Sequence, residues 1–442
     1  MLDSSVAPIG RLEAPPEESR AVRPLRIAHF NTFDIGGAAI AAARLHRALE
    51  AAGHESTLHL MQTRGGMPVA TAGQSRFQQA AAMLRPHLER LPVDLRFPRR
   101  QGKFSLAWLP NPLLRRVAQA GTADLLHLHW PGDGFIDIGG LRGVRRPIVW
   151  TLHDMWAFTG GCFYDAGCGR FATGCGRCPV IQSETESDSS SQVIRRKLAA
   201  WREANLTIVA PSRWMADEAR RSVVFKDRRI EVIPNCVELS VFKPVDQALA
   251  RSLFNLPAAR RLILFGAVKP RSEPRKGYAL LEEALSYLAK GRHAQETDIV
   301  IFGEGSRKTW QHAGFTWHSL GTLRDEVALS LAYNAADVFA APSLQDNLPN
   351  TVLEALACGT PCAAFGIGGM ADLIVHQKNG WLARPRTADD LAAGIEWILD
   401  DAGGPRELRA AARTFAVDRF SPERISSIHL QLYRELTYPT HL

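Results

Sequence analysis

Short apolar runs alternate with helix-length amphipathic stretches along the chain from residue 25 onwards. The first run, LRIAHFN (25–31), predicts a strand, NTFDIGG a turn, and AAIAAARLHRALEAAGH (38–54) a helix that Gly53 closes. The same alternation predicts further strands at STLHL (56–60), DLLHLHW (124–130), PIVWTLH (147–153), LTIVAPS (206–212) and IEVIP (230–234). Strands separated by helices indicate parallel βαβ units.

The alternation of apolar runs and amphipathic stretches starts again after the proline-containing stretch VFKPVD (241–246). Strands are expected at RLILFGAV (261–268), TDIVIFGEG (297–305), ADVFAAPS (336–343) and TPCAAFG (360–366). Helices are expected between them at GYALLEEALSYLA (277–289), RDEVALSLAYNA (324–335) and TVLEALACG (351–359). A last segment, SPERISSIHLQLYRELT (421–437), predicts a closing helix with Ser421 as its N-cap and Pro422 in the first helical position.

These patterns predict an α/β protein with two facing, doubly wound parallel-sheet domains. The chain has 442 residues, which is longer than one hydrophobic core usually grows. We assign 1–24 to a flexible leader, 25–242 to an N-terminal domain, 243–420 to a C-terminal domain, and 421–442 to the closing helix and tail. Because ligands of such sheets bind beyond the carboxyl ends of the strands, the cleft between the domains is the expected site.

The charge balance favours an anionic partner. The formal net charge is +8 and the pI about 9.3, which suits phosphates, nucleotides, nucleic acid or an acidic membrane without choosing among them. The first 20 residues carry acids and prolines where a signal peptide has basic and then apolar residues. No apolar run approaches the ~20 residues that cross a bilayer. We therefore expect a cytoplasmic protein whose only membrane contact is peripheral, on the inner face of the plasma membrane.

Two loops have the composition of anion sites. Gly36 and Gly37 lie between a strand and a helix, where glycines let backbone amides approach an anion, although a tight turn alone also needs them. Arg271, Arg275 and Lys276 come just before another helix, where cations and the helix N-terminus would attract a diphosphate together. A solvated basic loop would have the same composition.

Two acids eight positions apart form a third candidate. Asp346 follows the strand at 336–343, and Glu354 falls early in the helix at 351–359. A carboxylate accepts two hydrogen bonds from a vicinal diol, so Glu354 is suited to a ribose and Asp346 to a sugar hydroxyl. The alternative for Glu354 is an acid near a helix start that interacts with the helix dipole.

Taken together, the motifs resemble glycosyltransferase family 4, whose GT-B fold has two facing Rossmann-like domains. The matching features run from Leu25 to about Leu436. They are the glycine turn with GHE after its helix, TLHD (151–154), APSRWMADEAR, VIPNCVELSVFKP, RKG, IFGEG, the acid-x7-Glu element, GIGGMADLI and NGWL. HDMWAFTGGC and SLQDNLPNTVLEAL are most similar to bacterial exopolysaccharide transferases of the colanic-acid type.

The resemblance implies a nucleotide-sugar donor, UDP- or GDP-linked, held mainly by the C-terminal domain. Glu354 matches the glutamate that binds the ribose, and Lys276 the lysine that neutralises the diphosphate. Asp346 stands where the family has a glutamate that approaches the donor sugar, and it is one methylene shorter. The family's arginine after the strand glycine is missing, because Ala267 follows Gly266, so Arg271 or Arg275 is expected to replace it.

The remaining donor-binding positions follow the same resemblance. Gly36 and Gly37 match the loop near the diphosphate and the acceptor. His153 matches a histidine that contacts the donor sugar, against the alternative of a hydrogen-bonded core histidine. Three further positions are expected to contact the donor: Gly303, Asn347 and Leu348.

The family retains the anomeric configuration and needs no metal at the diphosphate. In agreement, the sequence has no Asp-x-Asp element at a strand end, and we expect activity in EDTA. The expected activity is that of a hexosyltransferase acting on a saccharide or a polyprenyl-diphosphate-linked saccharide. Rival interpretations are a nucleotide-sugar epimerase or a phosphorylase on the same fold, or a non-catalytic scaffold of a polysaccharide assembly complex.

Four of the seven cysteines cluster in CFYDAGCGRFATGCGRCP, within a loop at 160–180. They are Cys162, Cys168, Cys175 and Cys178. Four thiolates separated by glycines can surround a structural zinc, with reduced packed cysteines or a redox pair as alternatives. The other three, Cys236, Cys358 and Cys362, lie in apolar stretches and are expected to be buried.

One segment is strongly basic. Residues 85–116 hold eight Arg or Lys against two acids, with Phe97, Phe104 and Trp108 among them. Such a mixture can dock on an anionic leaflet, which would suit a lipid-linked acceptor, but a solvated face is the alternative. Nucleic-acid binding is disfavoured because no recognition module is present.

Overall fold

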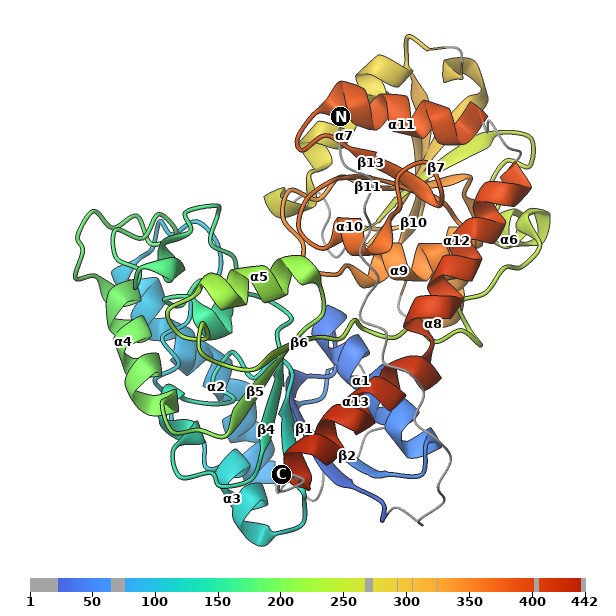
Figure 1. Cartoon of the computed structure of the whole chain (residues 1–442). Helices are drawn as coiled ribbons and strands as arrows, with labels where there is room; N and C mark the ends of the chain where they lie inside the picture. Colours follow the sequence, from blue (N-terminus) through green and yellow to red (C-terminus); the bar gives the residue numbers. More distant parts are fainter. Residues whose placement is uncertain are drawn as a thin grey trace.

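The computed structural model describes residues 23–64, 76–266, 273–291, 293–303, 305–323, 325–400 and 405–438. Arg271 and residues 1–22 of the expected leader lie outside these residues. The described chain forms two α/β units, each built on its own sheet (Figure 1). The predicted fold class is therefore confirmed, whereas the domain limits stay a prediction.

The N-terminal sheet is parallel throughout, in the order β2-β1-β3-β4-β5-β6. Its strands are β1 (Arg26–Phe33), β2 (Glu55–Gln62), β3 (Leu125–Leu128), β4 (Ile148–Thr151), β5 (Leu206–Ala210) and β6 (Ile230–Val232). The helices of this half are α1 (Gly37–Ala51), α2 (Arg76–Arg96), α3 (Leu113–Ala120), α4 (Ser189–Trp201) and α5 (Arg213–Arg221). The central strands β3, β4 and β5 are buried along their whole length, as strands covered on both faces must be.

The C-terminal sheet has the order β13-β12-β11-β7-β8-β10-β9. Its strands are β7 (Arg261–Gly266), β8 (Thr297–Phe302), β9 (Lys308–His312), β10 (Phe315–Gly321), β11 (Val338–Ala341), β12 (Cys362–Phe365) and β13 (Gly380–Ala383). Its helices are α6 (Gln247–Leu253), α7 (Tyr278–Leu288), α8 (Glu326–Ala335), α9 (Asn350–Ala357), α10 (Met370–Leu373), α11 (Ala388–Asp400) and α12 (Pro405–Phe420). The strands are parallel except for the antiparallel pair β9–β10.

The closing helix α13 (Pro422–Thr437) joins the two units. It begins as predicted, since the Ser421 side chain accepts a hydrogen bond from the Arg424 amide and Pro422 opens the helix. Although it follows α12 of the C-terminal unit, it lies against α1 and the N-terminal sheet (Figure 1). Its buried face packs Ile425 and Tyr433 into an apolar cluster of the N-terminal unit.

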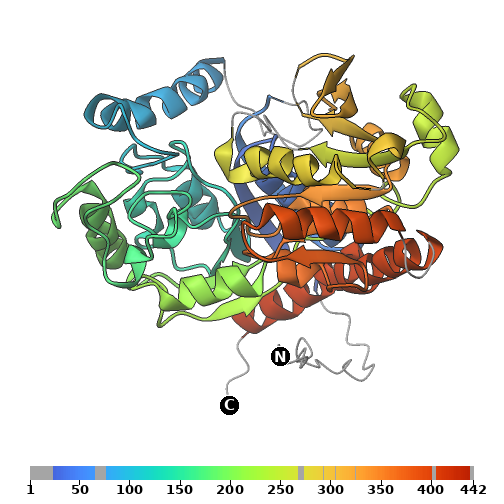
Figure 2. The same cartoon turned by 90° about the horizontal axis from the view of Figure 1, so that it is seen from above.

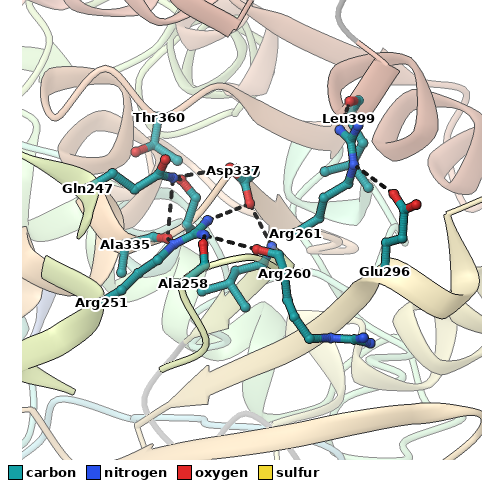
Figure 3. A network of polar contacts seen from close by, with 12 residues as sticks. Gln247, Arg251, Ala258, Arg260, Arg261, Glu296, Ala335, Asp337, Thr360 and Leu399 are labelled. Carbon is teal, nitrogen blue, oxygen red and sulfur yellow. Dashed lines mark hydrogen bonds and ion pairs between the residues drawn. The ribbon is translucent and has the colours of Figure 1, made fainter. Parts of the chain in front are cut away.

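A polar network fixes the amino-terminal edge of the C-terminal sheet (Figure 3). Asp337, just before β11, accepts hydrogen bonds from the Leu262 amide at 2.6 Å and from Arg251 Nη2 at 2.8 Å. Gln247 Nε2 donates to the other oxygen of the same carboxylate at 3.1 Å. The network ties α6 to β7 and β11 at the sheet edge remote from the expected site, so its role is structural.

Candidate functional site

The loops at the carboxyl ends of the two sheets face and contact each other. Asn347 Nδ2, after β11, donates to the Leu152 carbonyl, after β4, at 2.7 Å. Asn347 Oδ1 accepts from Ser212 Oγ, after β5, at 2.8 Å. Asn350 Nδ2, at the start of α9, donates to the Gly37 carbonyl, after β1, at 3.0 Å. The site expected from the topology of doubly wound sheets therefore lies at this junction.

The glycine turn of the N-terminal unit leads directly into α1. Gly36 is exposed and has a φ of 92°, a left-handed conformation that few side-chain-bearing residues adopt. The helix begins at Gly37, so its first amides are not used within the helix and can bind an anion.

Two cations and one acid form the core of the opposite side. Lys276 Nζ lies 2.6 Å from Asp346 Oδ2, and Arg275 Nη1 lies 3.4 Å from the same oxygen. Burial on its own would raise the pKa of Asp346, but Lys276 and Arg275 outweigh it and hold that pKa below its ordinary value. Asp346 is therefore ionised at neutral pH. Of the two arginines considered as replacements, the structure places Arg275 here.

Local geometry holds the basic loop against the acidic one. The Leu344 amide donates to the Arg275 carbonyl at 2.8 Å, and Arg275 Nη1 donates to the Gln345 carbonyl at 2.7 Å. Gly277 has a φ of 71°, and a Cβ there would lie 1.8 Å from the Pro342 carbonyl oxygen. Glycine is thus required after Lys276 to bring the two loops this close together.

Glu354 lies one turn into α9 and is 3% exposed. Its Oε1 accepts from Arg44 Nη2 of α1 at 2.8 Å, and its Oε2 accepts from Tyr333 OH at 3.0 Å. Arg44, 2% exposed, also bonds Glu326 at 2.8 Å. Burial raises the pKa of Glu354, and Arg44 and Tyr333 counteract that rise. The predicted ribose acid is therefore held in an ion pair between the domains, and no local sequence pattern identified Arg44 as its partner.

His153 and Asp154 follow β4 at the same junction. His153 Nε2 lies 3.3 Å from His129 Nδ1, and burial lowers the pKa of His153 to about 4, so its ring is neutral at pH 7. Asp154 accepts from the Trp130 indole N–H at 2.5 Å and from the Trp156 amide at 2.9 Å. Burial raises the pKa of Asp154 to about 6. His153 is partly exposed and so is available to a ligand.

The cysteine-bearing loop also reaches the site, which the sequence did not indicate. Gln345 Nε2 donates to Asp165 Oδ1 at 2.9 Å. The Arg275 guanidinium lies over the Tyr164 ring, 4.5 Å from its centroid. This loop therefore contacts the residues that flank Asp346.

The other residues expected at the site make contacts within the fold. Gly303 directly follows β8, and its amide donates to the Gly321 carbonyl at 2.9 Å. The Leu348 side chain packs in the apolar core of the C-terminal unit. Cys236, Cys358 and Cys362 are buried as expected.

A buried histidine group was not foreseen. In the described parts of the chain, His29, His127 and His129 form the group of three metal-capable side chains whose ligand atoms lie within 4.8 Å of one another. Most of their ring nitrogens are hydrogen-bonded. His127 bonds Tyr433 OH and Thr151 Oγ1, and His129 bonds His29 and His153. This group is therefore a buried polar network beneath α13.

None of the helices in the described ranges combines the length and the apolar composition that a membrane span needs. Basic residues of the segment 85–116 lie partly on α2.

Comparison with known proteins agrees with this architecture. Residues 35–241 match the family described as Glycosyltransferase Family 4, and residues 259–401 match the one described as Glycosyl transferases group 1. The D-inositol 3-phosphate glycosyltransferase of Paenarthrobacter aurescens is 27% identical over 329 residues, which cover 71% of this chain and 73% of that relative. The enzyme of the same name from Xylanimonas cellulosilytica is 28% identical over 336 residues, covering 72% and 73% of the two chains.

Solved structures show the same fold. Sucrose-phosphate synthase from Thermosynechococcus elongatus has a TM-score of 0.64 at 20% identity and covers 94% of this chain and 100% of its own. Anabaena HepE in complex with UDP-glucose has a TM-score of 0.60 at 17% identity and covers 92% and 99%. The closer likeness to exopolysaccharide transferases stays a prediction. The chain belongs to the glycosyltransferases of the GT-B fold, with a family 4 domain in its N-terminal half and a group 1 domain in its C-terminal half.

Proposed function

We propose that this glycosyltransferase moves a sugar from a UDP- or GDP-sugar to a saccharide or polyprenyl-diphosphate-linked saccharide, with retention of configuration. The product would serve a bacterial exopolysaccharide or another cell-surface polysaccharide. One observation carries the proposal. In the segment 342–350, Asp346 accepts a hydrogen bond from Lys276, and Asn350 donates one to the Gly37 carbonyl of the facing unit. Residues chosen from distant motifs as donor ligands thus meet at one junction.

The cations at this junction suit a diphosphate. Lys276 and Arg275 now share the Asp346 carboxylate, and the amides at the start of α1 lie on the facing domain. A donor diphosphate offers the same cations more negative charge than one carboxylate does. Stabilisation of the leaving nucleoside diphosphate by these groups is an electrostatic contribution that requires no divalent metal. HepE, a neighbour in fold, was solved with UDP-glucose, which supports this donor class.

The sugar end of the donor would meet His153 and Asp346. A neutral imidazole both donates and accepts hydrogen bonds, which suits sugar hydroxyls. Asp346 is fixed by two cations and by Ser343 Oγ at 3.2 Å, so its carboxylate is oriented before the donor arrives. This preorganisation lowers the cost of orienting the carboxylate, although the side chain stays one methylene shorter.

The donor site is tested by Lys276→Ala. We expect turnover of UDP- or GDP-sugars to fall about 10²-fold or more, because one charge opposite the leaving group is removed. Lys378→Ala, an exposed lysine of the same domain, is the matched control and should leave turnover unchanged. Turnover in Lys276→Ala within about threefold of the wild type would refute the donor assignment.

Product analysis separates the acceptor and reaction classes. One arm supplies a polyprenyl-diphosphate-linked saccharide and another D-inositol 3-phosphate, the acceptor that the curated relatives' names give. We expect transfer to the lipid-linked saccharide, an unchanged anomeric configuration by NMR, and full activity in EDTA. An epimerised donor formed without acceptor would identify an epimerase. Loss of activity in EDTA that Mg²⁺ alone restores would contradict the metal-independent mechanism.

A lipid-linked acceptor calls for contact with a membrane, and α2 has a surface suited to it. Its exposed apolar side chains range from 46% exposed at Leu88 to 75% at Leu95, and they include Met83, Leu84 and Leu91. At 3.6 residues per turn these positions share one face, opposite the buried face formed by Ala82, Pro86, Glu89 and Val93. Figure 2 shows this helix, in light blue, at the outer edge of the N-terminal unit.

Exposed basic side chains occur in the same part of the chain as this apolar face. Arg96, Arg99, Lys103, Arg115 and Arg116 are exposed on α2 and in the segments that follow it. An apolar stripe within a basic segment suits an anionic leaflet, where each charge near the surface contributes about 1 kcal/mol. We infer that this surface docks on the inner leaflet.

Sedimentation with vesicles tests the docking. The protein should sediment with phosphatidylglycerol vesicles at low salt and not with phosphatidylcholine vesicles. Leu91→Glu with Leu95→Glu should abolish it, whereas Leu253→Glu, which changes a residue 54% exposed on α6, should not. Equal sedimentation of all three proteins would refute this surface.

A further inference from the structure

The four clustered cysteines surround one small cavity of the N-terminal unit. Cys162 and Cys178 are buried, and Cys168 and Cys175 are partly exposed. All four line the same cavity, whose free space of about 10 Å³ matches a single water-sized sphere. The fold therefore brings together thiols spread over residues 162–178.

Backbone amides face three of the four sulfurs. The amides of Val180 and Ile181 face the Cys178 sulfur, and the Arg170 amide faces that of Cys168. The Gly160 amide faces Cys175 in the same way. Such hydrogen bonds favour the thiolate, but burial outweighs them and raises the pKa of all four cysteines, so these are neutral thiols before a metal binds.

Consecutive left-handed residues build this arrangement. Gly174, Cys175, Gly176 and Arg177 have φ values of 107°, 61°, 98° and 43°. A left-handed conformation costs side-chain-bearing residues such as Cys175 and Arg177 free energy, so the surroundings must hold it. The sequence Cys-Gly-Arg-Cys thereby turns two sulfurs toward the same space.

A buried lysine lies beside the cluster. Lys197 of α4 is 0% exposed, and its Nζ donates to the Thr159 carbonyl at 2.9 Å and to the Trp156 carbonyl. It also lies over the Trp156 ring, 3.9 Å from the centroid. These partners carry no formal charge, so they do not neutralise a buried ammonium. Burial lowers the pKa of Lys197 to about 7, and Cys162, Cys175 and Asp154 counteract part of that shift.

We propose that Cys162, Cys168, Cys175 and Cys178 bind one structural Zn²⁺, and that Lys197 offsets the negative charge of that centre. A divalent ion with four thiolates carries a net charge of 2−, so a neighbouring cation stabilises it. Four neutral thiols bind Zn²⁺ and release four protons, and both sides of this exchange carry a charge of 2+. The last two cysteines have the Cys-x2-Cys spacing of zinc sites.

The four sulfurs have to move closer to one another when the ion binds. Zn–S bonds of ~2.3 Å place tetrahedral sulfurs about 3.8 Å apart. Among the described residues only the histidine trio has three ligand atoms within 4.8 Å, so the thiols are more widely spaced here. Glycines at 167, 169, 174 and 176 give the loop the freedom to contract.

The metal would stiffen the loop that contacts the donor domain. Between the first two cysteines lie Tyr164 and Asp165, which contact Arg275 and Gln345. On its other side the Cys178 amide donates to Asp188, the N-cap of α4, at 2.9 Å. Zinc would thus fix the distance between α4 and the interdomain contact without taking part in the reaction.

Elemental analysis of the purified full-length wild type tests the site directly. We expect about one zinc per chain, and replacement by Co²⁺ should give the absorption of tetrahedral cobalt thiolate. Zinc below about 0.1 per chain, an iron–sulfur spectrum, or a disulfide between two of these cysteines would each overturn the proposal. Because this measurement uses the wild type, it does not depend on whether a variant folds.

Variants locate the site. Cys175→Ser and Cys178→Ser should each reduce zinc content at least tenfold, whereas Cys362→Ser, which changes a buried core cysteine outside the cluster, should keep it. Equal zinc content in all three variants would overturn the assignment. If prolonged chelation lowers the activity, and Zn²⁺ restores it but Mg²⁺ does not, the loss arises from this loop. The result is therefore distinguishable from failure of the proposed transfer reaction.

Discussion

The histidines beneath α13 predict that mild acid weakens the packing of the closing helix on the N-terminal unit. His429 of α13 is 3% exposed; its Nδ1–H donates to the Ile425 carbonyl at 2.9 Å, while its buried Nε2 has no partner among the described residues. Its ring faces His127, with centroids 5.7 Å apart. The nearby titratable groups on the sheet are His29, His127, His129 and His153, and burial lowers the pKa of each.

The sign and size of the effect follow from the pKa of His429. Burial lowers it to about 4 in the folded protein, against about 6.5 in the unfolded chain. The folded protein therefore binds this proton less readily, so stability is full above pH 6.5 and decreases as the pH falls toward 4. At 1.36 kcal/mol per pH unit the whole gap corresponds to roughly 3 kcal/mol, of which roughly 2 kcal/mol is lost between pH 7 and pH 5. His153, with a pKa of about 4 and partial exposure, adds a smaller loss of the same sign.

Thermal unfolding at pH 7 and pH 5 measures this dependence. A loss of roughly 2 kcal/mol lowers the Tm of a unit this size by about 4–8 °C. His429→Gln should remove about that part of the pH dependence, while His87→Gln, an exposed residue on α2, should leave it unchanged. A wild type with the same Tm at both pH values, or the same pH dependence in His429→Gln, would refute the reasoning.

Two further predictions concern buried charges. Arg44→Met leaves Glu354 buried without its cation, which should destabilise the protein by about 3–5 kcal/mol in thermal unfolding. Arg44→Met combined with Glu354→Gln should recover part of this loss. Equal losses in the single and the double variant would contradict the pairing. Asp337→Ala removes the acceptor of Arg251 Nη2 and of the Leu262 amide, while the other nitrogens of Arg251 keep their carbonyl partners. The change should cost about 1–3 kcal/mol in urea unfolding and leave the affinity for the sugar nucleotide unchanged. A change in donor affinity would contradict the structural role of that network.

The alternation of apolar runs was enough to predict most strands of both sheets, because buried parallel strands are almost continuously apolar. Both strands of the hairpin β9–β10 were missed, and for β9 the reason is the opposite one, whereas β10 is mostly buried. Lys308, Thr309, Gln311 and His312 make the edge strand β9 polar and exposed, so it does not stand out as a strand. The strand β13 was also missed; it is as short as β3, β4, β11 and β12, but its two central residues are only partly buried.

The candidate site was predictable where a motif is local. Lys276, Asp346 and the Gly36–Gly37 turn each lie at a strand-to-helix junction, which the sequence marks by glycines and charges. The partners across the interface were not predictable. Arg44 and Glu354 are 310 positions apart, and Asp165 and Gln345 are 180 apart. Their contacts depend on how the domains meet, and no periodicity within a segment encodes that arrangement.

The position of Arg44 bears on how a donor would enter. Under the proposed role of Glu354, a ribose has to take the carboxylate that Arg44 now holds at 2.8 Å. Releasing a buried guanidinium would be costly if it had no other partner. Arg44 also bonds Glu326 at 2.8 Å, and that carboxylate is partly exposed, so it can remain the partner when Glu354 turns to the ribose. Both acids belong to the C-terminal unit and the arginine to α1. Donor binding would therefore weaken, without abolishing, the ionic contact between the domains, which couples occupation of the donor site to their separation.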